Sequence, residues 1–180
     1  MTRITVLGSI TMDPVAYAAR APVLGETVAG KEFRTVPGGK GAHQAVAAAR
    51  AGGEVTRAGA VAADAYGSRL RGVLTSSGAG TALVRTAESA GGTAHVVVDD
   101  TGAEPIVVVP GANGTVTALG RVPKVAPSAG ATFLGTPAVA LGEGRLADKA
   151  VARASSAAAL YVQKPGASTS MPYRSEIDAS

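Results

Sequence analysis

Residues 38–61 read GGKGAHQAVAAARAGGEVTRAGAV, and this stretch decides the fold. Its glycine-rich start is followed by an alanine-rich segment, Ala42 to Arg50, which is predicted to be a helix stopped by Gly52-Gly53. The next segment, Glu54 to Val61, is predicted to be a core strand. A helix that leads into a buried strand is the repeating unit of an α/β layer, so this stretch predicts an α/β fold.

The flanking segments continue the alternation of strands and helices. Ile4 to Ser9 is a short β-rich run and predicts a buried first strand. Asp64 is placed to cap a second helix, which runs to about Ser77 and ends at Gly78. A short strand is predicted from Thr81 to Thr86. These segments together predict the layer of a small α/β domain.

Two further segments predict a small β flap beside this layer. Between Val15 and Val36 the pattern is broken by prolines and glycines, and short strands such as residues 26–29 fit there. The β-branched runs His95 to Asp99 and Ile106 to Val109 are separated by a turn-rich stretch and predict a hairpin. The flap segments are therefore placed at about 15–36 and 94–110.

The C-terminal third has a different character. Residues 117–130 are rich in proline and glycine and are interpreted as a connector. Helical stretches are predicted at about 131–143 and 147–162, followed by a loop from Lys164 to Pro172. We interpret residues 1–180 as a single domain.

Composition and charge narrow the classes of function. The 46% of hydrophobic residues include few aromatics, so the core must be built from Ala, Val and Leu. The net charge of +4 comes from scattered basic residues. A nucleic-acid-binding surface would need a cluster of Lys and Arg, so no nucleic-acid partner is expected. The chain has no cysteine, which excludes disulfides, thiolate metal sites and cysteine nucleophiles. No basic-then-apolar signal precedes the first strand and no apolar run is long enough to span a bilayer, so we expect no membrane association and a cytoplasmic protein. The pair Asp99-Asp100 is interpreted as turn geometry, and neither a metal nor a cofactor is expected.

Several motifs resemble the ribokinase family of carbohydrate kinases, in the order that this family has them. The resemblance implies a reduced, ribokinase-like three-layer α/β fold with a small β flap that acts as a lid. The matching segments are Gly8-Ser9-Ile10-Thr11-Met12-Asp13, Gly25-Glu26-Thr27, Gly38-Gly39-Lys40-Gly41-Ala42-His43-Gln44-Ala45, Asp64-Ala65-Tyr66-Gly67, Val107-Val108-Val109-Pro110-Gly111-Ala112-Asn113, Ala129-Gly130-Ala131-Thr132-Phe133-Leu134-Gly135 and Pro165-Gly166-Ala167-Ser168-Thr169-Ser170-Met171-Pro172.

The sequence departs from this family at the machinery for phosphoryl transfer. The family has a long segment between the equivalents of Asn113 and Ala129 that supplies most of its nucleotide site, and here a short connector stands in its place. The family's catalytic motif is Gly-Ala-Gly-Asp, whereas this chain has Ser128-Ala129-Gly130-Ala131. Ala129 and Gly130 are thus a former anion hole, and Ala131 stands at the former catalytic position. Its methyl group cannot accept a proton as the carboxylate of a general base does.

The resemblance also implies which residues contact the ligand. Thr11 and His43 stand where the family has asparagines, and Glu104 lies one residue from the position of a sugar-contacting glutamate. Lys40 is either a cation of the pocket or a solvated side chain. His43 is either a hydrogen-bonding replacement for an amide or an acid–base catalyst. The predicted substrate-binding residues are Thr11, Asp13, Gly39, Lys40, His43 and Glu104.

Three functions stay open at this point. The first is a non-phosphorylating protein that binds a sugar, a nucleoside or a similar small polyhydroxylated ligand. The second is a different enzyme, such as an isomerase, cyclase or hydrolase of a biosynthetic pathway, which uses His43, Lys40 and Asp13 in the former sugar pocket. The third is an inactive, truncated ribokinase.

The resemblance further implies a homodimer. In the family two flaps clasp each other and cover the sugar pocket. A thin flap cannot bury both of its faces alone, and exposed strand edges favour pairing with a second chain.

Overall fold

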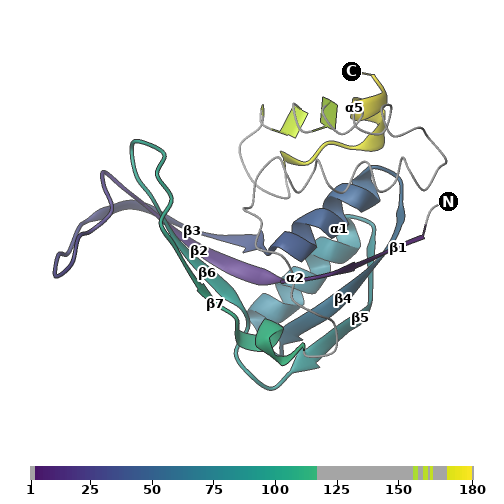
Figure 1. Cartoon of the computed structure of the whole chain (residues 1–180), viewed down its shortest axis with the longest axis horizontal. Helices are drawn as coiled ribbons and strands as arrows, with labels where there is room; N and C mark the ends of the chain where they lie inside the picture. The colour runs from purple at the N-terminus through teal and green to yellow at the C-terminus, as the bar shows by residue number, and fades with distance from the viewer. Residues whose placement is uncertain (1–2, 117–155, 158–159, 162, 164–169, 180) are drawn as a thin grey trace.

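The chain folds as an α/β layer from which a second sheet projects (Figure 1). The computed structural model describes residues 3–116, 156–157, 160–161, 163 and 170–179. The predicted connector, the first predicted C-terminal helix and the former catalytic position lie outside these residues. Ser156, Ala157, Leu160 and Tyr161 are helical, as the second predicted C-terminal helix requires.

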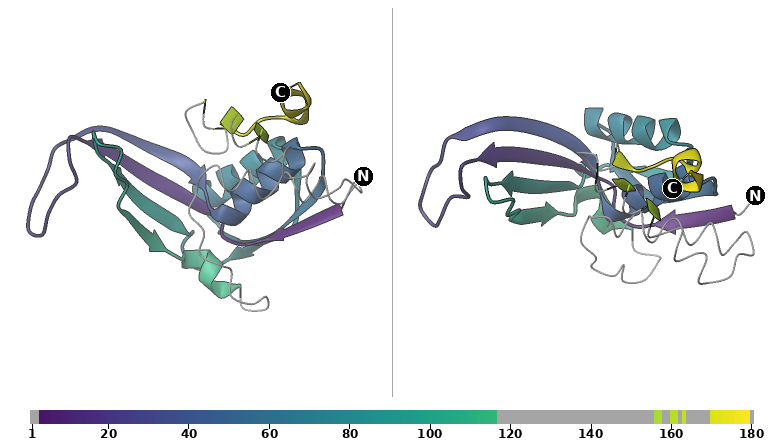
Figure 2. Two further views of the ribbon diagram at one scale, coloured as in Figure 1. Left: turned by 45° about the horizontal axis from the view of Figure 1, so that its top comes forward. Right: turned by 90° about the horizontal axis from the view of Figure 1, so that it is seen from above.

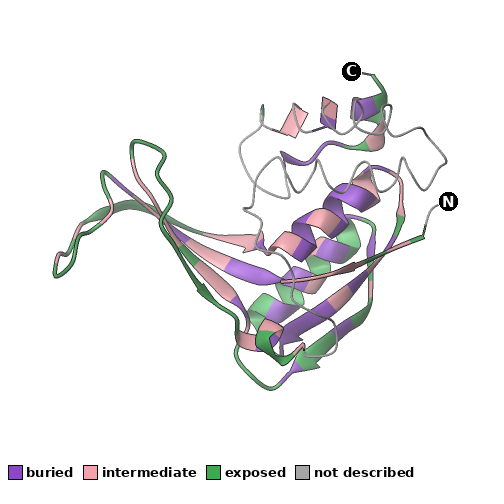
Figure 3. Ribbon diagram, in the orientation of Figure 1, coloured by how far each residue is buried: buried purple, intermediate pink, exposed green. Residues whose placement is uncertain are grey.

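The layer is a parallel sheet covered by two helices. Its strands lie in the order β1-β4-β5, with β4 pairing in parallel with both neighbours. The elements are β1 (Arg3–Leu7), α1 (Lys40–Arg50), β4 (Glu54–Ala62), α2 (Ala65–Ser76) and β5 (Ala79–Ala87). The core is built mainly of Ala, Val and Leu, as the composition predicted, together with Ile10, Ile177, Met12 and Met171. Figure 3 shows the buried face of α1 turned toward this core.

The projecting sheet is larger than the predicted flap. It has the strand order β3-β2-β6-β7, in which β2 and β6 are parallel and the two outer pairs antiparallel. Figure 2 shows it extending away from the helices as a curved wing. Its strands are β2 (Thr11–Ala18), β3 (Gly30–Gly38), β6 (Thr93–Val98) and β7 (Ile106–Val109).

The prediction of the first flap segment was wrong in detail. Residues 26–29 are not a strand, and the flap begins at Thr11 rather than at Val15. Proline is uncommon inside a strand, so Pro14 obscures the β pattern of this segment in the sequence although the strand runs through it. The pairing of β2 comes from β3 on one side and from β6 on the other, which are distant in sequence. The predicted hairpin is confirmed as the antiparallel pair of β6 and β7.

The two helices are capped by different means. The Asp64 carboxylate accepts a hydrogen bond of 2.6 Å from the Gly67 N–H, which confirms the predicted cap of α2. Gly78, with φ +84°, follows the end of α2, as predicted. α1 begins at Lys40, two residues earlier than predicted, because Ser9 caps it from outside. The Lys40 N–H donates to the Ser9 hydroxyl (3.1 Å) and the Ala42 N–H to the Ser9 carbonyl (3.1 Å).

The glycines at the start of α1 allow a close approach between backbones. Gly39 has φ +97°, and a Cβ there would lie 2.5 Å from the Ser9 carbonyl oxygen. A Cβ on Gly41 would lie 2.8 Å from the Gly8 Cα. The first turn of α1 therefore packs directly on the end of β1, where no side chain has room.

A buried arginine lies beneath this contact. The Arg57 side chain is fully buried on β4, and its guanidinium donates to the carbonyl oxygens of Val6 (2.7 Å), Gly8 (2.6 Å), Ser9 (3.1 Å) and Ala58. Burial lowers the pKa of Arg57 to about 10, which leaves the guanidinium charged at neutral pH. The backbone carbonyls that turn toward it satisfy the charge and fix the path of the chain out of β1.

The segment after β7 ties the two sheets together. It forms a short 3₁₀ helix, η1 (Gly111–Thr115), at the foot of the wing (Figure 1). The Asn113 side chain accepts a hydrogen bond from the Ile10 N–H and donates one to the Ile10 carbonyl, both of 2.8 Å. One side chain thus satisfies both backbone groups of the residue that joins the layer to β2.

The C-terminal segment completes the core above α1. Met171 and Ile177 are buried with the core residues of α1, and Ile177 lies in the short helix α5 (Arg174–Asp178). The Arg50 guanidinium donates to the Met171 carbonyl (2.6 Å) and stacks over the Tyr173 ring at 4.7 Å. None of the described helices is long and apolar enough to cross a membrane.

Replacement of Arg57 tests its role at the junction. Arg57→Met removes the charge and leaves several carbonyls without their donor, so we expect a loss of about 3 kcal/mol in the free energy of unfolding. Arg57→Lys keeps the charge but not the fork of donors and should lose less. Urea unfolding followed by circular dichroism measures both variants. Equal stability of Arg57→Met and the wild type would contradict this role.

Candidate functional site

The strands and the first helix bring three predicted ligand-binding residues to one corner. Thr11 and Asp13 are two residues apart on β2, so their side chains lie on the same face of the projecting sheet. Thr11 is paired with Gly38, the last residue of β3. His43 follows five residues later, in the first turns of α1. The corner lies where β2, β3 and α1 meet at the base of the wing (Figure 1).

Gly38 makes room for the Asp13 carboxylate. A Cβ built on Gly38 would overlap with both carboxylate oxygens and with the Asp13 Cγ. The Asp13 side chain therefore lies directly over the Gly38 backbone. A residue with any side chain at position 38 would displace the carboxylate from this corner.

Each of the three side chains has a buried polar atom without a hydrogen-bond partner in the protein. These atoms are the Thr11 hydroxyl oxygen, Oδ1 of Asp13 and Nε2 of His43. Thr11 and His43 are themselves buried, with exposed fractions of 4% and 3%. Buried polar groups are normally hydrogen-bonded, because a lost bond to water is not replaced otherwise. These three groups on neighbouring elements make the corner the candidate site.

Burial shifts both titratable groups of this corner toward their neutral forms. Burial raises the pKa of Asp13, against the opposing effects of the Thr11 hydroxyl and the Ala94 backbone. Burial also lowers the pKa of His43, opposed by its hydrogen bond to the Pro37 backbone. At neutral pH the imidazole is therefore uncharged and can accept a proton or a hydrogen bond.

Gly39 and Lys40 lie beside the corner, where the loop leads into α1. The Lys40 and Ala42 amides donate to Ser9. Gly39 allows contact with the Ser9 backbone. The glycine signature thus allows close packing of α1 on β1, and Lys40 is half-buried at the first position of α1.

The structure does not bring Glu104 to this corner. The β2–β6 register places Asp13 beside Ala94, whereas Glu104 is exposed in the turn beyond Val98 at the far end of the hairpin. Asp13 itself lies inside β2 of the second sheet. The predicted residues thus separate into a corner of Thr11, Asp13 and His43 and a distant hairpin tip.

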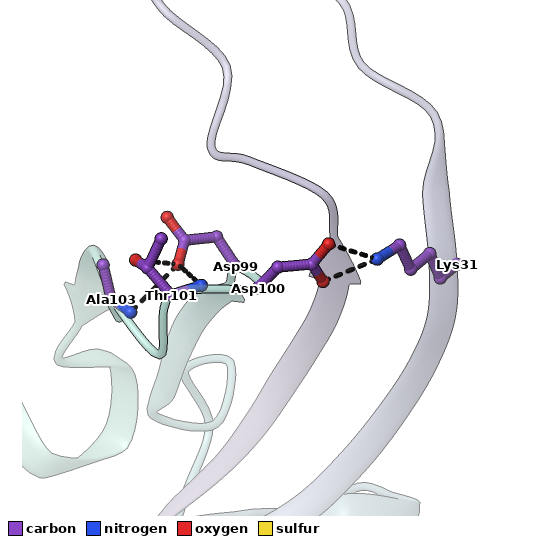
Figure 4. Close-up of polar contacts among 5 residues, drawn as sticks. All are labelled: Lys31, Asp99, Asp100, Thr101 and Ala103. Carbon is purple, nitrogen blue, oxygen red and sulfur yellow. Dashed lines mark hydrogen bonds and ion pairs between the residues drawn. The ribbon is translucent and has the colours of Figure 1, made fainter.

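The two aspartates of the hairpin have structural partners. Figure 4 shows the Asp99 carboxylate accepting from the Thr101 N–H (2.8 Å), the Thr101 hydroxyl (2.6 Å) and the Ala103 N–H (3.0 Å). Asp100 forms an ion pair of 2.5 Å with Lys31 on β3. These contacts confirm the interpretation of Asp99-Asp100 as turn residues. In the described part of the chain, no three His, Asp or Glu side chains group as metal ligands do.

Sequence reasoning missed three residues whose side chains hold the backbone of the elements that carry the corner. They are Ser9, which caps α1, Asn113, which holds Ile10, and Arg57, which holds the end of β1. An arginine within a predicted core strand is a signal that could have been read, because a buried charge requires polar partners. The partners of Ser9 and Asn113 are 31 and 103 residues away, which no local pattern encodes.

Comparison with known proteins finds a family match for the N-terminal two thirds of the chain. A model described as "pfkB family carbohydrate kinase" matches residues 1–125. Ribokinase from Bacillus subtilis is 46% identical over 118 residues, which are 65% of this chain and 40% of that protein. Ribokinase from Lactococcus lactis is 42% identical over 117 residues, or 64% of this chain and 39% of that protein. The matched region is thus about 40% of the length of these curated relatives.

Solved structures show the same fold. Ribokinase from Thermotoga maritima aligns with a TM-score of 0.86 at 21% identity, covering 99% of each chain. Arabidopsis thaliana ribokinase complexed with ribose and ATP aligns with a TM-score of 0.84 at 20% identity, covering 99% of this chain and 98% of that one. The predicted ribokinase-like α/β fold is therefore confirmed.

The Asp13→Asn variant should be more stable than the wild type at neutral pH. A raised pKa in the folded state means that Asp13 favours folding below its unfolded pKa of 3.8 and loses this contribution as pH rises through the folded value. Removing the unpaired charge should stabilise the fold by about 1 kcal/mol, or about 2–4 °C in Tm. Thermal melts at pH 7 and pH 4.5 test this expectation. The advantage of the variant should shrink at the lower pH, and a less stable variant at pH 7 would contradict it.

Proposed function

Because this chain belongs to the pfkB family of carbohydrate kinases, we propose that it binds a sugar, a nucleoside or a similar small polyhydroxylated ligand without phosphorylating it. The observation that carries the proposal is the corner of Thr11, Asp13 and His43, with one unpartnered polar atom on each side chain. Hydroxyl groups of a polyol could donate to Asp13 and His43 and exchange hydrogen bonds with Thr11. The ligand would replace the water that these atoms lost on folding.

The proposal that phosphate is not transferred rests on the sequence. Ala131 stands where the family has its catalytic aspartate, and a short connector stands in place of the segment that supplies most of the nucleotide site. We interpret residues 1–180 as one domain in which the sugar pocket persists and the nucleotide half is missing.

A second candidate is a repurposed enzyme of another reaction class. The observation in its favour is His43, which is buried, neutral at physiological pH and unpartnered at Nε2. A neutral imidazole is suited to acid–base chemistry on a bound polyol. Product analysis after the ligand incubations described next separates this candidate from simple binding.

The absence of kinase activity has a direct test. Incubation with ATP and ribose should give no steady release of ADP, because the loss of a general base alone costs roughly 10²–10⁴-fold in rate. Ala131→Asp should not restore turnover, since nucleotide positioning would still be lacking. Calorimetry with ribose, related sugars and nucleosides should show binding to at least one of them. Family-like ATP turnover refutes the loss of activity, and binding to no polyol or nucleoside refutes the ligand class.

We further propose a homodimer that forms through the projecting sheet. Both faces of this sheet carry exposed apolar side chains: Val108 is 62% exposed, and Phe33 and Val107 are 65% and 67% exposed. Val108 is paired with Ala94, which lies beside Asp13, so Val108 is on the face of the ligand corner. Phe33 and Val107 lie on the opposite face. A second copy placed on the Asp13 face would bury Val108 and close the corner.

Light scattering coupled to size exclusion tests the dimer and its face. The wild type should elute as a dimer at micromolar concentration. Val108→Glu should give a monomer, because it places a charge in the proposed interface. Val97 lies on the opposite face of β6, so Val97→Glu is a matched control with the same added charge. A monomeric wild type, or a dimer that Val108→Glu leaves intact, would contradict this interface.

A further inference from the structure

We propose that Asn113 is a site of spontaneous deamidation, and that this modification loosens the wing, the sheet of β2, β3, β6 and β7, from the parallel sheet. The chain has a single asparagine, and Gly114 follows it directly. Asparagine is thermolabile, and it reacts most readily before glycine, which has no side chain to hinder the attack of its backbone nitrogen. The inference concerns the link between the two sheets and does not depend on the proposed ligand site.

The reaction requires only these two residues and water. The backbone nitrogen of Gly114 attacks Cγ of Asn113, so that a bond forms between them and the Cγ–Nδ2 bond breaks. Nδ2 leaves as ammonia and takes the proton from the Gly114 nitrogen. Water then opens the cyclic imide at either of its carbonyl groups, which yields aspartate or isoaspartate at position 113.

Gly114 leaves the approach to Asn113 open, although the fold does not require glycine at this position. Gly114 is exposed, and a Cβ there would make an ordinary contact of 3.6 Å with the Pro110 side chain. Gly92 differs, because a Cβ there would overlap with Nδ2 of Asn113. Alanine therefore fits at position 114, and the Gly114→Ala variant can slow the chemistry without disturbing the junction.

The amide nitrogen that deamidation removes carries both donors of the link. Nδ2 of Asn113 donates to the Ile10 carbonyl (2.8 Å) and to the Pro110 carbonyl (3.2 Å). In the aspartate product a carboxylate oxygen takes the place of Nδ2 and faces the same two carbonyl oxygens. Acceptor then meets acceptor, and the Ile10 carbonyl loses the donor that held it. Isoaspartate also lengthens the backbone of η1 by a carbon atom.

The same hydrogen bonds govern when the reaction takes place. They hold the Asn113 amide against Ile10 and Pro110, so the reaction proceeds when the junction opens locally. The product cannot restore these bonds, so a transient opening becomes permanent. β2 begins at Thr11, directly after Ile10, and the modification therefore loosens the attachment of the wing at its first strand.

The test incubates the full chain at mildly alkaline pH without denaturant. Peptide mapping by mass spectrometry should show aspartate and isoaspartate accumulating at position 113. Gly114→Ala should slow this accumulation at least about tenfold and should melt as the wild type does, which makes it the matched control. Asn113→Asp, which reproduces one product, should melt about 5 °C below the wild type. Hydrogen exchange in the deamidated protein should rise more in β2 than in β4.

Each step of the inference has an outcome that overturns it. If product forms in urea but not in the folded chain, the link protects Asn113 and the site is wrong. Equal rates for Gly114→Ala and the wild type would exclude attack by the Gly114 nitrogen. If deamidated protein melts and exchanges as fresh protein does, the modification does not loosen the wing. The measurements on the wild type and on Gly114→Ala decide the question even if Asn113→Asp does not fold.

Discussion

The guanidinium of Arg57 holds the point at which the chain leaves the parallel sheet, and the rest of the structure depends on that point. It donates to the carbonyls of Val6, Gly8 and Ser9, which would otherwise be buried at a sharp change of direction. Such a fan of donors is available to no other side chain. Because the charge lies beneath Gly8 and Gly41, those positions must also lack side chains.

From this junction the two arms of the ligand corner extend in different directions. Ser9 caps the first turn of α1 and thereby sets the position of His43. Ile10, held by Asn113, leads into β2 and sets the positions of Thr11 and Asp13. The three orphaned groups are therefore placed by backbone contacts that need no ligand. A corner fixed in this way is organised before binding, which reduces the entropy lost when a ligand enters.

Three features of this structure lower the stability of the isolated chain. The core is made of small aliphatic side chains, which bury less area per residue than aromatic ones. Against this modest gain, the corner keeps one carboxylate oxygen of Asp13 and one imidazole nitrogen of His43 out of water without a hydrogen-bond partner. The wing adds exposed apolar side chains on both faces. Features that weaken an isolated chain in this way are typical of surfaces and sites that bind something else.

Local sequence determined the elements whose signals are local. The Asp64 cap, the glycine at the end of α2 and the β-branched hairpin could all be predicted, because each depends on residues within a few positions of one another. The long glycine signature and its neighbours were enough to identify the family. The same motifs indicated Thr11, Asp13 and His43 as candidates for ligand contact.

Only the tertiary structure decided which of the candidates meet. Glu104 belongs to a distant hairpin tip, because the parallel register of β2 with β6 places Ala94 beside Asp13. The glycine loop packs α1 on β1, because the Lys40 N–H donates to the hydroxyl of Ser9, which lies 31 residues earlier in the chain. Register between distant strands and the partners of a buried charge are fixed by long-range packing. No window of sequence contains them, because the residues involved are brought together only when the chain folds.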